Sequence, residues 1–335
     1  ALARASADTG RLLPGTAAFK NAFNQVIADP NVLSGSRLVD NSRIYESDAN
    51  YNLEDLISFA EIQVGGSFRQ YQLDSGGRIY TDANGPIYYN EYGLYTQATK
   101  KMMDDRLKFT GSIRYDKSQN FKGNYSPRVS LVYSAGQNKN HNFRGSFQTG
   151  FRNPTTQDQY IGFNVGSAIL LGSAPDNLTR YSETLPISGA AVPTIGSSVG
   201  INGTNAYDNS YTATSALAFA SSGGNTALLR KTDVDVVKPE EVKAFELGYR
   251  SFINKTSIDI NGYYNIYNNF IGNLNVVAPL YGLAQNNPTL GNPNLAVFPI
   301  DPGSQSVHAL RTGNTRTFQL YTNTDLEIKS LGFGI

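Results

Sequence analysis

The residue types that most often carry out chemistry are scarce in this sequence. It has no cysteine and only two histidines, His141 and His308, so disulfides, thiolate metal sites and histidine-based triads have almost no material. The acidic residues Asp104, Asp233 and Asp235 fall in a predicted turn and a predicted loop, with no nucleophile or base nearby. The motifs of phosphate-binding loops, zinc proteases and serine hydrolases are missing. The sequence therefore predicts that the protein is not an enzyme and holds no cofactor or metal.

Two Gly-rich stretches, at 74–77 and 82–85, superficially resemble half of a calcium-binding loop. Calcium requires six or more oxygen ligands, and Asp or Asn before Gly is far more often a turn former. We therefore interpret both stretches as turns.

Charged and aromatic side chains remain as candidates for ligand binding. One group occupies the polar positions of alternating segments and consists of Arg114, Arg128, Arg144, Glu246 and Arg250. These side chains could attract an anionic ligand, pair with acids elsewhere in the protein, or form a hydrogen-bond network on one polar surface. A second group lies at or beside predicted loops and consists of Tyr80, Tyr88, Tyr89, Arg152 and Asn153. Its tyrosines could stack on a sugar ring or cap a siderophore; Tyr92, close by, fits an interfacial position better.

The elements that position these residues are predicted to be β-strands. Charged residues make up only 16% of the chain, while Gly, Tyr and Phe are abundant, which favours strands joined by turns. Apolar and polar residues alternate with period two in many segments. We predict nine strands, at roughly 37–51, 57–73, 88–102, 107–117, 126–136, 141–152, 241–254, 256–270 and 315–334.

The links between these strands alternate in length. Short polar turns follow the strands that end near 102, 136 and 254, whereas longer links occupy 74–90, 116–126, 153–240 and 272–314. Short turns on one side and long loops on the other are typical of an outer-membrane barrel. A soluble sandwich or β-helix would also alternate, and so would a soluble surface adhesin, but aromatic residues near the strand ends favour the barrel. The sequence lacks an apolar run long enough for a spanning helix. The net charge of +1 gives no support to a nucleic-acid partner.

Several stretches resemble the transporter barrels of TonB-dependent receptors. The segment 237–250 is similar to that family's "L-x-P-E … E-x-G" element, in which a Pro-Glu turn leads from an outer loop into a strand. The segment 149–155 is similar to its "G-F-R-x-P" at the top of a strand, and 126–133 and 261–271 resemble the strands around these elements. The likeness covers roughly residues 88–271, in the family's order.

The resemblance implies an antiparallel transmembrane β-barrel of 22 strands with an N-terminal plug. We expect residues 1–335 to be a portion of one such barrel domain, with 153–240 as a long extracellular loop region, and nothing before residue 37 resembles a plug. Nine strands cannot close such a barrel, so we expect the sequence to be part of a longer protein. The lumen-facing candidates would then be Arg114, Arg128, Arg144, Glu246 and Arg250.

Two functions follow from this resemblance. The first is TonB-dependent import, across the outer membrane of a Gram-negative bacterium, of a nutrient too large for porins, such as an oligosaccharide, a peptide or a siderophore. The partners would be outer-membrane lipids, the TonB complex acting through the plug, and a surface lipoprotein lid. The alternative is a structural barrel subunit of a larger outer-membrane assembly with partner lipoproteins.

Overall fold

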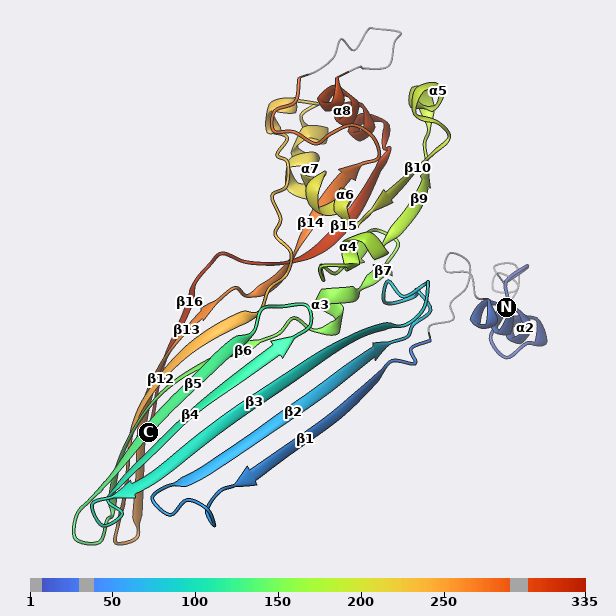
Figure 1. Ribbon diagram of the computed structural model, residues 1–335. Helices are drawn as coiled ribbons and strands as arrows, with labels where there is room; N and C mark the ends of the chain where they lie inside the picture. The colour runs from blue at the N-terminus through green and yellow to red at the C-terminus, as the bar shows by residue number, and fades with distance from the viewer. Residues whose placement is uncertain (1–7, 30–38, 290–300) are drawn as a thin grey trace.

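The chain forms a long curved β-sheet with a smaller compact unit at one end (Figure 1). The structure is a computed structural model, and it describes residues 8–29, 39–289 and 301–335. A short helix, α2 (Ala17–Ala28), lies beside the sheet and is capped at its N-terminus by Thr16, whose hydroxyl accepts from the amide of Phe19. Within the described ranges, none of the helices has the length and apolar character needed to cross a membrane.

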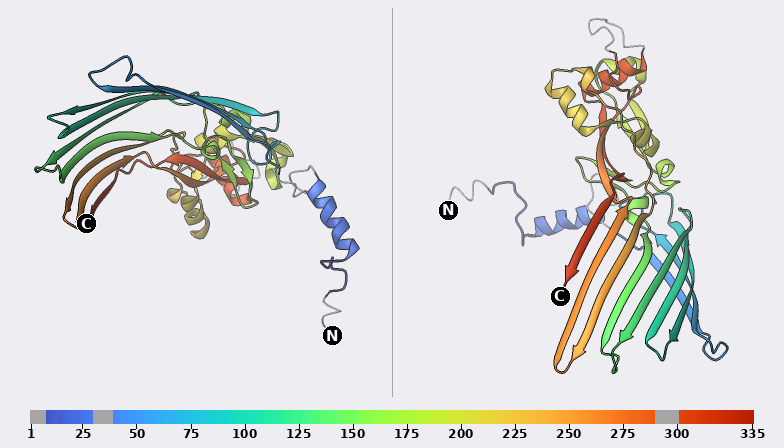
Figure 2. Two further views of the ribbon diagram at one scale, coloured as in Figure 1. Left: turned by 90° about the horizontal axis from the view of Figure 1, so that it is seen from below. Right: turned by 90° about the vertical axis from the view of Figure 1, so that its left-hand side faces the viewer.

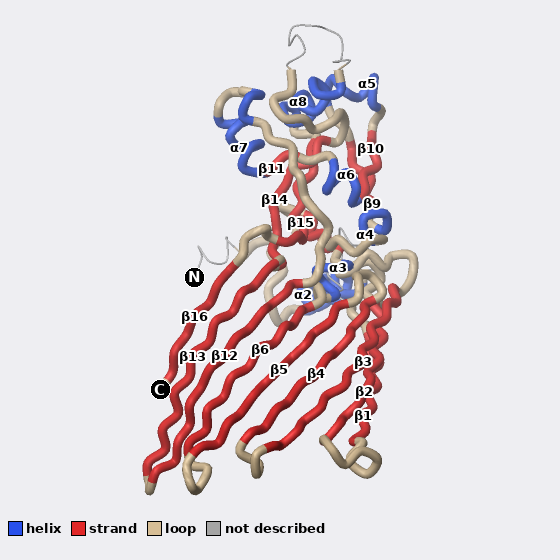
Figure 3. Tube along the Cα trace, turned by 60° about the vertical axis from the view of Figure 1, so that its left-hand side comes forward, coloured by secondary structure: helices blue, strands red, loops and turns tan. Residues whose placement is uncertain are grey.

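The main sheet has nine antiparallel strands in the order β1-β2-β3-β4-β5-β6-β12-β13-β16 (Figure 3). Their bounds are β1 (Arg43–Asn52), β2 (Glu61–Leu73), β3 (Ile87–Met102), β4 (Leu107–Ser118), β5 (Asn124–Ala135), β6 (His141–Arg152), β12 (Glu240–Ile253), β13 (Thr256–Asn268) and β16 (Ile328–Gly334). Each strand of this sheet pairs with the next strand of the sheet along the chain. The pairs β6–β12 and β13–β16 are joined through long links. Eight of the nine predicted strands correspond to one strand of this sheet each; the part of the first that covers residues 37 and 38 lies outside the described residues.

The two ends of the sheet differ in their connections. At one end, the turn end, the links are 53–60, 103–106, 136–140 and 254–255. At the other, the loop end, the links are 74–86, 119–123, 153–239 and 269–327. The tight β3–β4 turn is made by Met103, Asp104 and Asp105 in left-handed conformation, with φ of 57°, 54° and 62°, a region where short polar residues are tolerated better than most. The predicted alternation of link lengths is present at three of the four loop-end links. The link predicted at 116–126 is wrong as a long one, because β4 and β5 extend into it and leave only residues 119–123 between them.

Period-two alternation gives this sheet two chemically different faces. One row of register-paired side chains runs through Val129, Phe147, Phe245, Tyr264 and Leu331 across β5, β6, β12, β13 and β16. We call the side that carries this row the apolar face. The rings of Phe147 and Phe245 lie 4.9 Å apart, a contact that stabilises such a pair by about 0.5–1.5 kcal/mol beyond area burial.

The neighbouring row, one residue along each strand, points to the opposite side. It runs through Ser130, Ser146, Glu246, Tyr263 and Gly332, and we call its side the polar face. The sheet is curved (Figure 2), and its polar face is the concave one. A contact shows the same curvature, because the Asn153 side chain at the end of β6 reaches Glu91 of β3 across β4 and β5.

The compact unit at the loop end, which we call the loop subdomain, is built from two links, 153–239 and 269–327. Its central sheet has five strands in the order β11-β14-β15-β8-β7. The strands are β7 (Gly162–Asn164), β8 (Ile169–Leu171), β11 (Tyr211–Thr212), β14 (Ile271–Pro279) and β15 (Thr315–Asn323), and a separate hairpin joins β9 (Ser182–Pro186) to β10 (Ser198–Asn202). The helices are α3 (Thr156–Tyr160), α4 (Asn177–Arg180), α5 (Val192–Ile195), α6 (Gly203–Asp208), α7 (Ala213–Ser221) and α8 (Pro302–Thr312), with short 3₁₀ turns η1 (Gly189–Ala191) and η2 (Thr226–Leu228).

The loop subdomain has a hydrophobic core of its own. Leu171 of β8 and Phe318 and Leu320 of β15 are completely buried, and Val276 of β14 and Tyr207 of α6 pack into the same cluster. Strand β15 pairs in parallel with β8 from the first link and antiparallel with β14 from the second. The two links therefore fold together as one packed unit.

The structure corrects the prediction for the end of the chain. The sequence predicts one strand over 315–334, but β15 belongs to the loop subdomain and β16 to the main sheet. The break at 324–327 is hidden in the sequence because apolar alternation resumes on both sides of it. The segment predicted as a long link at 272–314 likewise contains β14 and α8, and its residues 290–300 lie outside the described residues.

Candidate functional site

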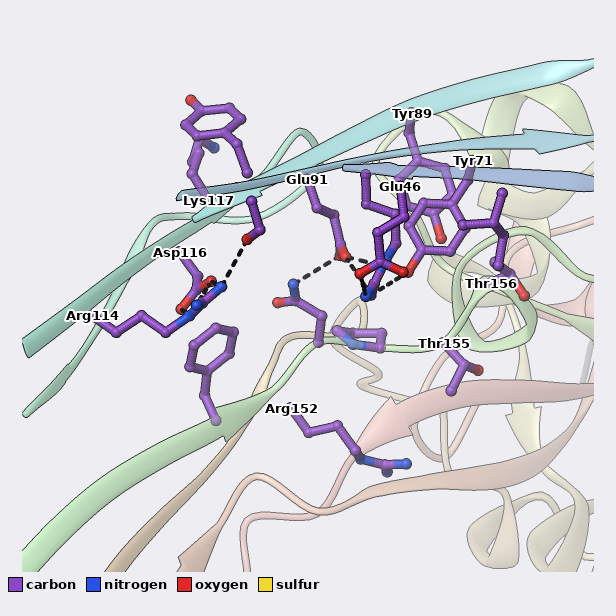
Figure 4. Close-up of a pocket in the computed structure, with 17 residues that line it drawn as sticks. Glu46, Tyr71, Tyr89, Glu91, Arg114, Asp116, Lys117, Arg152, Thr155 and Thr156 are labelled. Atoms are coloured by element: carbon purple, nitrogen blue, oxygen red, sulfur yellow. Dashed lines mark hydrogen bonds and ion pairs between the residues drawn. The ribbon is translucent and has the colours of Figure 1, made fainter. Parts of the chain in front are cut away.

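A polar cavity lies on the polar face near the loop end of the main sheet. It has a volume of about 490 Å³ and is lined by side chains of β1, β2, β3, β4, the end of β6 and the start of α3 (Figure 4). Most of the lining is charged or hydroxylated. Its charged members are Glu46, Arg69, Glu91, Arg114, Asp116, Lys117 and Arg152.

Strand register brings the first charged group of this cavity together. Arg69 of β2 stands opposite Glu46 of β1 and opposite Glu91 of β3. Its guanidinium donates to Glu46 at 2.6 Å and lies 3.9 Å from Glu91. The Tyr71 hydroxyl, next on the same face of β2, donates to Glu91 at 3.3 Å. Alternation along three adjacent strands therefore forms a connected polar network.

A second ion pair lies further along the same face. Arg114 of β4 binds Asp116 of the same strand at 2.6 Å and also donates to the Ser67 hydroxyl of β2 at 3.0 Å. Between them, β3 presents Gly93, and a Cβ there would lie 2.3 Å from the Arg114 guanidinium. The glycine thus leaves the space through which Arg114 reaches across β3.

Aromatic packing closes the cavity toward the loop end. Tyr89 of β3 is 1% exposed, and its ring stacks on that of Tyr71 with centroids 4.4 Å apart. The ring of Tyr160, from α3, lies 5.6 Å from Tyr89 on the other side. This stack fixes α3 against the end of the main sheet, so the wall at Thr155 and Thr156 is held in place.

Asn153 joins the two walls of the cavity. Its amide nitrogen donates to Glu91 at 2.9 Å, while its oxygen is buried and, among the described residues, accepts no hydrogen bond. Buried polar atoms without a partner are uncommon in folded proteins, so a small movement of the Asn153 side chain would be needed for this oxygen to accept from a ligand or from water. Next to it, Arg152 binds Glu240 of β12 through two hydrogen bonds of 2.7 and 2.8 Å.

The electrostatics of the cavity suit binding rather than catalysis. Each of its carboxylates is matched by a nearby arginine, and the amine of Lys117 donates to the carbonyl of Phe121. In the described ranges, the structure contains no cluster of three or more metal-ligating side chains. The arrangement can hold a polar ligand in a fixed orientation through preformed donors and acceptors.

The structure brings together only part of the predicted loop group. Tyr89, Arg152 and Asn153 line or support the cavity. Tyr88 is 52% exposed on the apolar face, and Tyr92 points to the same face. Tyr80 is partly buried beside α3, where its hydroxyl lies 3.4 Å from that of Thr156.

The five predicted lumen-facing residues all lie on the polar face, in separate environments. Arg114 belongs to the cavity. Arg144 contacts Glu246 at 3.4 Å and Asp259 at 3.2 Å, and Arg250 contacts Asp259 at 3.3 Å. Arg128 stands opposite Gln148 in register. Arg144, Glu246 and Arg250, together with Asp259, thus form an ion-pair network that spans β6, β12 and β13.

Sequence reasoning missed Glu46, Arg69, Glu91 and Asp116. A partial signal was present, because Ser67 and Arg69 flank the apolar Phe68 in β2 and Arg114 follows the apolar Ile113 in β4. The missing information was the register that places Glu46 and Glu91 on either side of Arg69.

The two Gly-rich stretches form a turn, as predicted. Asp82 is 2% exposed, and its carboxylate accepts from the Ser75 amide, the Ser75 hydroxyl and the amides of Gly76 and Gly77. These hydrogen bonds hold the two halves of the 74–86 link together. The carboxylate oxygens are thus committed to the protein's own donors.

Several solved structures are similar to this chain at low identity. The siderophore receptor PirA from Pseudomonas aeruginosa is 15% identical, with a TM-score of 0.47, over 88% of this chain and 40% of that one. PirA from Acinetobacter baumannii is 13% identical, with a TM-score of 0.43, over 90% of this chain and 35% of that one. The Serratia marcescens hemophore receptor HasR, as a double mutant in complex with its hemophore HasA and heme, is 10% identical, with a TM-score of 0.44, over 87% of this chain and 38% of that one.

The chain thus spans about two fifths or less of the length of these proteins. No curated protein sequence matches it. A family model described as "TonB dependent receptor-like, beta-barrel" matches residues 5–324, so the chain belongs to the TonB-dependent receptor β-barrel family, and its nine-stranded sheet is part of an antiparallel transmembrane β-barrel.

Proposed function

We propose that the chain forms part of the channel of an outer-membrane importer, which takes up a nutrient too large for porins and is driven by the TonB complex. Proteins of this family are transporters and receptors of the Gram-negative outer membrane that interact with TonB. The observation that carries the proposal is the polar cavity, set into the concave polar face of a sheet whose opposite face is apolar. A wall of this kind contacts lipid on one side and a passing polar solute on the other.

The orientation follows from the links. We place the loop end outside the cell and the turn end in the periplasm, because outer-membrane barrels carry short periplasmic turns and longer extracellular loops. Aromatic pairs mark both borders of the apolar band on its lipid side: Tyr115 with Tyr125, and Phe143 with Tyr249. Within β5, the distance from Tyr125 to Tyr133 is about 26 Å along the strand at about 3.3 Å per residue. At the strand tilt of about 35–45° found in such barrels this is a height of about 19–22 Å, somewhat less than the apolar band of about 25 Å.

In this arrangement the cavity lies at the extracellular mouth of the channel. A ligand would meet Asn153, Arg69 and Glu91 before it enters the lumen. A plug connected to TonB would hold the channel shut until energy is supplied, and the loop subdomain would be the surface against which a lipoprotein lid rests.

Uptake by living cells tests the proposal. A strain of the source organism that lacks the gene would be grown with a neutral oligosaccharide, a peptide or a ferric siderophore as the limiting nutrient. We expect loss of growth on one of these classes, the same loss in a strain without TonB, and rescue by the intact gene. Arg69→Ala in the cavity is expected to rescue poorly, whereas Arg43→Ala, on the apolar face of β1, is expected to rescue fully.

Full growth of the deletion strain on every class would contradict import. If that strain also lost a partner lipoprotein from its outer membrane, the structural-subunit function would replace it.

A further inference from the structure

A second cavity of about 490 Å³ lies on the polar face, away from the first, over β6, β12 and β13. We propose that this cavity is a subsite for a neutral, hydroxyl-rich ligand, namely a saccharide chain. The inference rests on the proposed function and specifies the substrate class that the channel would carry.

The side chains of β13 give the cavity its chemical character. Asn261, Tyr263, Asn265 and Tyr267 occupy alternate positions of this strand and therefore project from the same face. Amide and phenol groups thus follow one another along the strand, with about 6.6 Å between successive members, since each residue rises about 3.3 Å. The Asn265 amide donates to the Tyr267 hydroxyl at 3.3 Å, which orients this part of the row.

Small side chains on the neighbouring strands leave room beside this row. On the polar face, β12 presents Val242 and Ala244 next to it, and both line the cavity. Ser146 and Gln148 of β6 form the opposite wall. The result is a groove between two polar walls.

Tyr263 is held in a position that suits stacking. Its ring covers Gly332 of β16, where an added Cβ would lie 2.2 Å from two ring atoms. One side of the ring therefore rests on the backbone of β16, yet the residue remains 41% exposed. An aromatic surface supported from behind and open in front loses little conformational entropy when a flat apolar surface packs on it.

The hydrogen-bonding groups match hydroxyl groups better than charges. Amide side chains offer both donors and acceptors to neighbouring hydroxyls, and phenols offer one of each. The cavity lining contains no lysine or arginine, and its one charged member is Glu246. The nearby cation Arg144 is already bound to Glu246 and Asp259. Arg128 stands opposite Gln148 at the edge of the groove, but the lining itself offers an anionic ferric complex only Glu246, whereas it offers a sugar ring a stacking surface and amides.

The position of the groove relative to the first cavity supports a chain-like ligand. Both cavities lie on the same concave face, the first toward β1–β4 and the second over β6, β12 and β13. A ligand of several linked units can contact two separate subsites, and each contact adds to its residence in the channel.

Binding to the full-length protein, purified from outer membranes in detergent, tests the inference. The probes are maltohexaose, cellohexaose and xylohexaose, with ferric enterobactin as the anionic comparison, and the readout is calorimetric titration. We expect at least one hexasaccharide to bind and ferric enterobactin not to compete with it. Tyr263→Ala is expected to weaken binding about tenfold, which corresponds to about 1.4 kcal/mol, and Tyr263→Phe to keep it within about twofold because the ring remains.

Two further variants separate recognition from folding. Gly332→Leu removes no ligand-contacting group but displaces the Tyr263 ring, so it should weaken binding about as much as Tyr263→Ala. Tyr264→Ala changes the same residue type one position along, on the apolar face, and should leave affinity unchanged. Thermal unfolding of each variant shows whether the protein itself is intact.

Three outcomes would overturn the inference: none of the hexasaccharides binds, ferric enterobactin binds in their place, or Tyr263→Ala lowers thermal stability and leaves affinity intact. The last result would show that another part of the protein covers the groove. These outcomes are independent of import, because a TonB-dependent growth defect without saccharide binding refutes only the subsite. Saccharide binding without any growth defect refutes only the proposed import.

Discussion

The roles of single side chains at the loop end depend on partners that lie far away in the sequence. Arg152 and Asn153 follow one another, but Arg152 binds Glu240 and Asn153 binds Glu91. Their residue types suggested contact with a ligand, and for Asn153 the buried free oxygen keeps that role open. For Arg152, both bonds to Glu240 show that its guanidinium also has a structural task. Sequence alone could not distinguish these roles, because neither partner is a neighbour in the chain.

A histidine in the loop subdomain makes one residue-scale prediction about pH. His308 of α8 has a pKa below its ordinary value, because burial disfavours its cation and Arg311 repels it. A depressed pKa in the folded state means that stability is fully present above the unfolded pKa of about 6.5 and is lost as pH falls through the folded value. We expect amide exchange in α8, corrected for its intrinsic rate, to be faster at pH 5 than at pH 7.5. His308→Gln should abolish this difference; an unchanged pH dependence in the variant would assign it to another group.

At the scale of elements, alternation was a sound guide to eight of the nine strands of the main sheet. From β3 to β6 and in β12 and β13, the predicted strands agree with the pairing, and the five residues predicted at polar positions lie on the polar face. The same reasoning could not find the loop subdomain, because strands such as β7, β8 and β11 have only three, three and two residues. Period two cannot be recognised over so few positions, and these strands exist because β14 and β15 supply a sheet edge and a core.

Glu240 is the point where three elements meet, and this makes a second prediction. Its carboxylate binds Arg152 at the end of β6 and accepts from the Ile271 amide at the start of β14 at 2.8 Å. Glu240→Ala should leave that amide and Arg152 without their partner and loosen the base of the loop subdomain. We expect faster hydrogen exchange in 271–279, with the middle of β12 unaffected. Glu241→Ala, which points to the opposite face, is the matched control, and equal exchange in both variants would contradict the role of Glu240.

The whole molecule combines the main sheet, which forms a wall of the barrel, with the loop subdomain, and the two are stabilised differently. The wall exposes large apolar side chains, such as Leu247 at 73% and Leu331 at 81%, which only a lipid environment or another covering surface would shield from water. The loop subdomain buries its apolar residues in a core. Composition indicated the wall, because strands rich in Tyr, Phe and Gly dominate the sequence. It could not indicate the subdomain, whose core is assembled from two links separated by β12 and β13.

Neighbouring residues of β5 test which side of the wall meets lipid. Val129 is 44% exposed on the apolar face, and Ser130 lies on the polar face. We expect Val129→Arg to lower barrel stability by about 2–4 kcal/mol, the cost of an arginine at mid-membrane, and Ser130→Arg to cost much less. Urea unfolding in detergent-lipid micelles, followed by loss of heat-modifiable migration, measures both. Equal costs would mean that the lipid-facing side is wrongly assigned.

Removing a core residue of the loop subdomain should uncouple it from the wall. Phe318 is fully buried and meets Tyr181 edge-on, with ring centroids 5.9 Å apart. Phe318→Ala is expected to destabilise the subdomain by about 3–5 kcal/mol. Trypsin should then cleave at Arg180 and Arg230, whose side chains are already exposed but whose backbone the intact fold holds in place, while the barrel still migrates as a folded species. Leu217→Ala, at a residue that is 69% exposed, should resist trypsin as the unchanged protein does. Loss of the folded barrel in Phe318→Ala would show that wall and subdomain unfold together.

The joint construction of the loop subdomain has a consequence for how such receptors diversify. The link 153–239 leaves from β6 and returns in β12, which are adjacent strands, so by itself it could be exchanged between relatives like a cassette. Its strand β8, however, pairs with β15 of the other link, and their side chains share one core. Recombination that replaced one link alone would leave β8 or β15 without its partner. We therefore expect the two links to be inherited together, and their lengths to vary in concert among descendants of a common ancestor while the wall between them changes little.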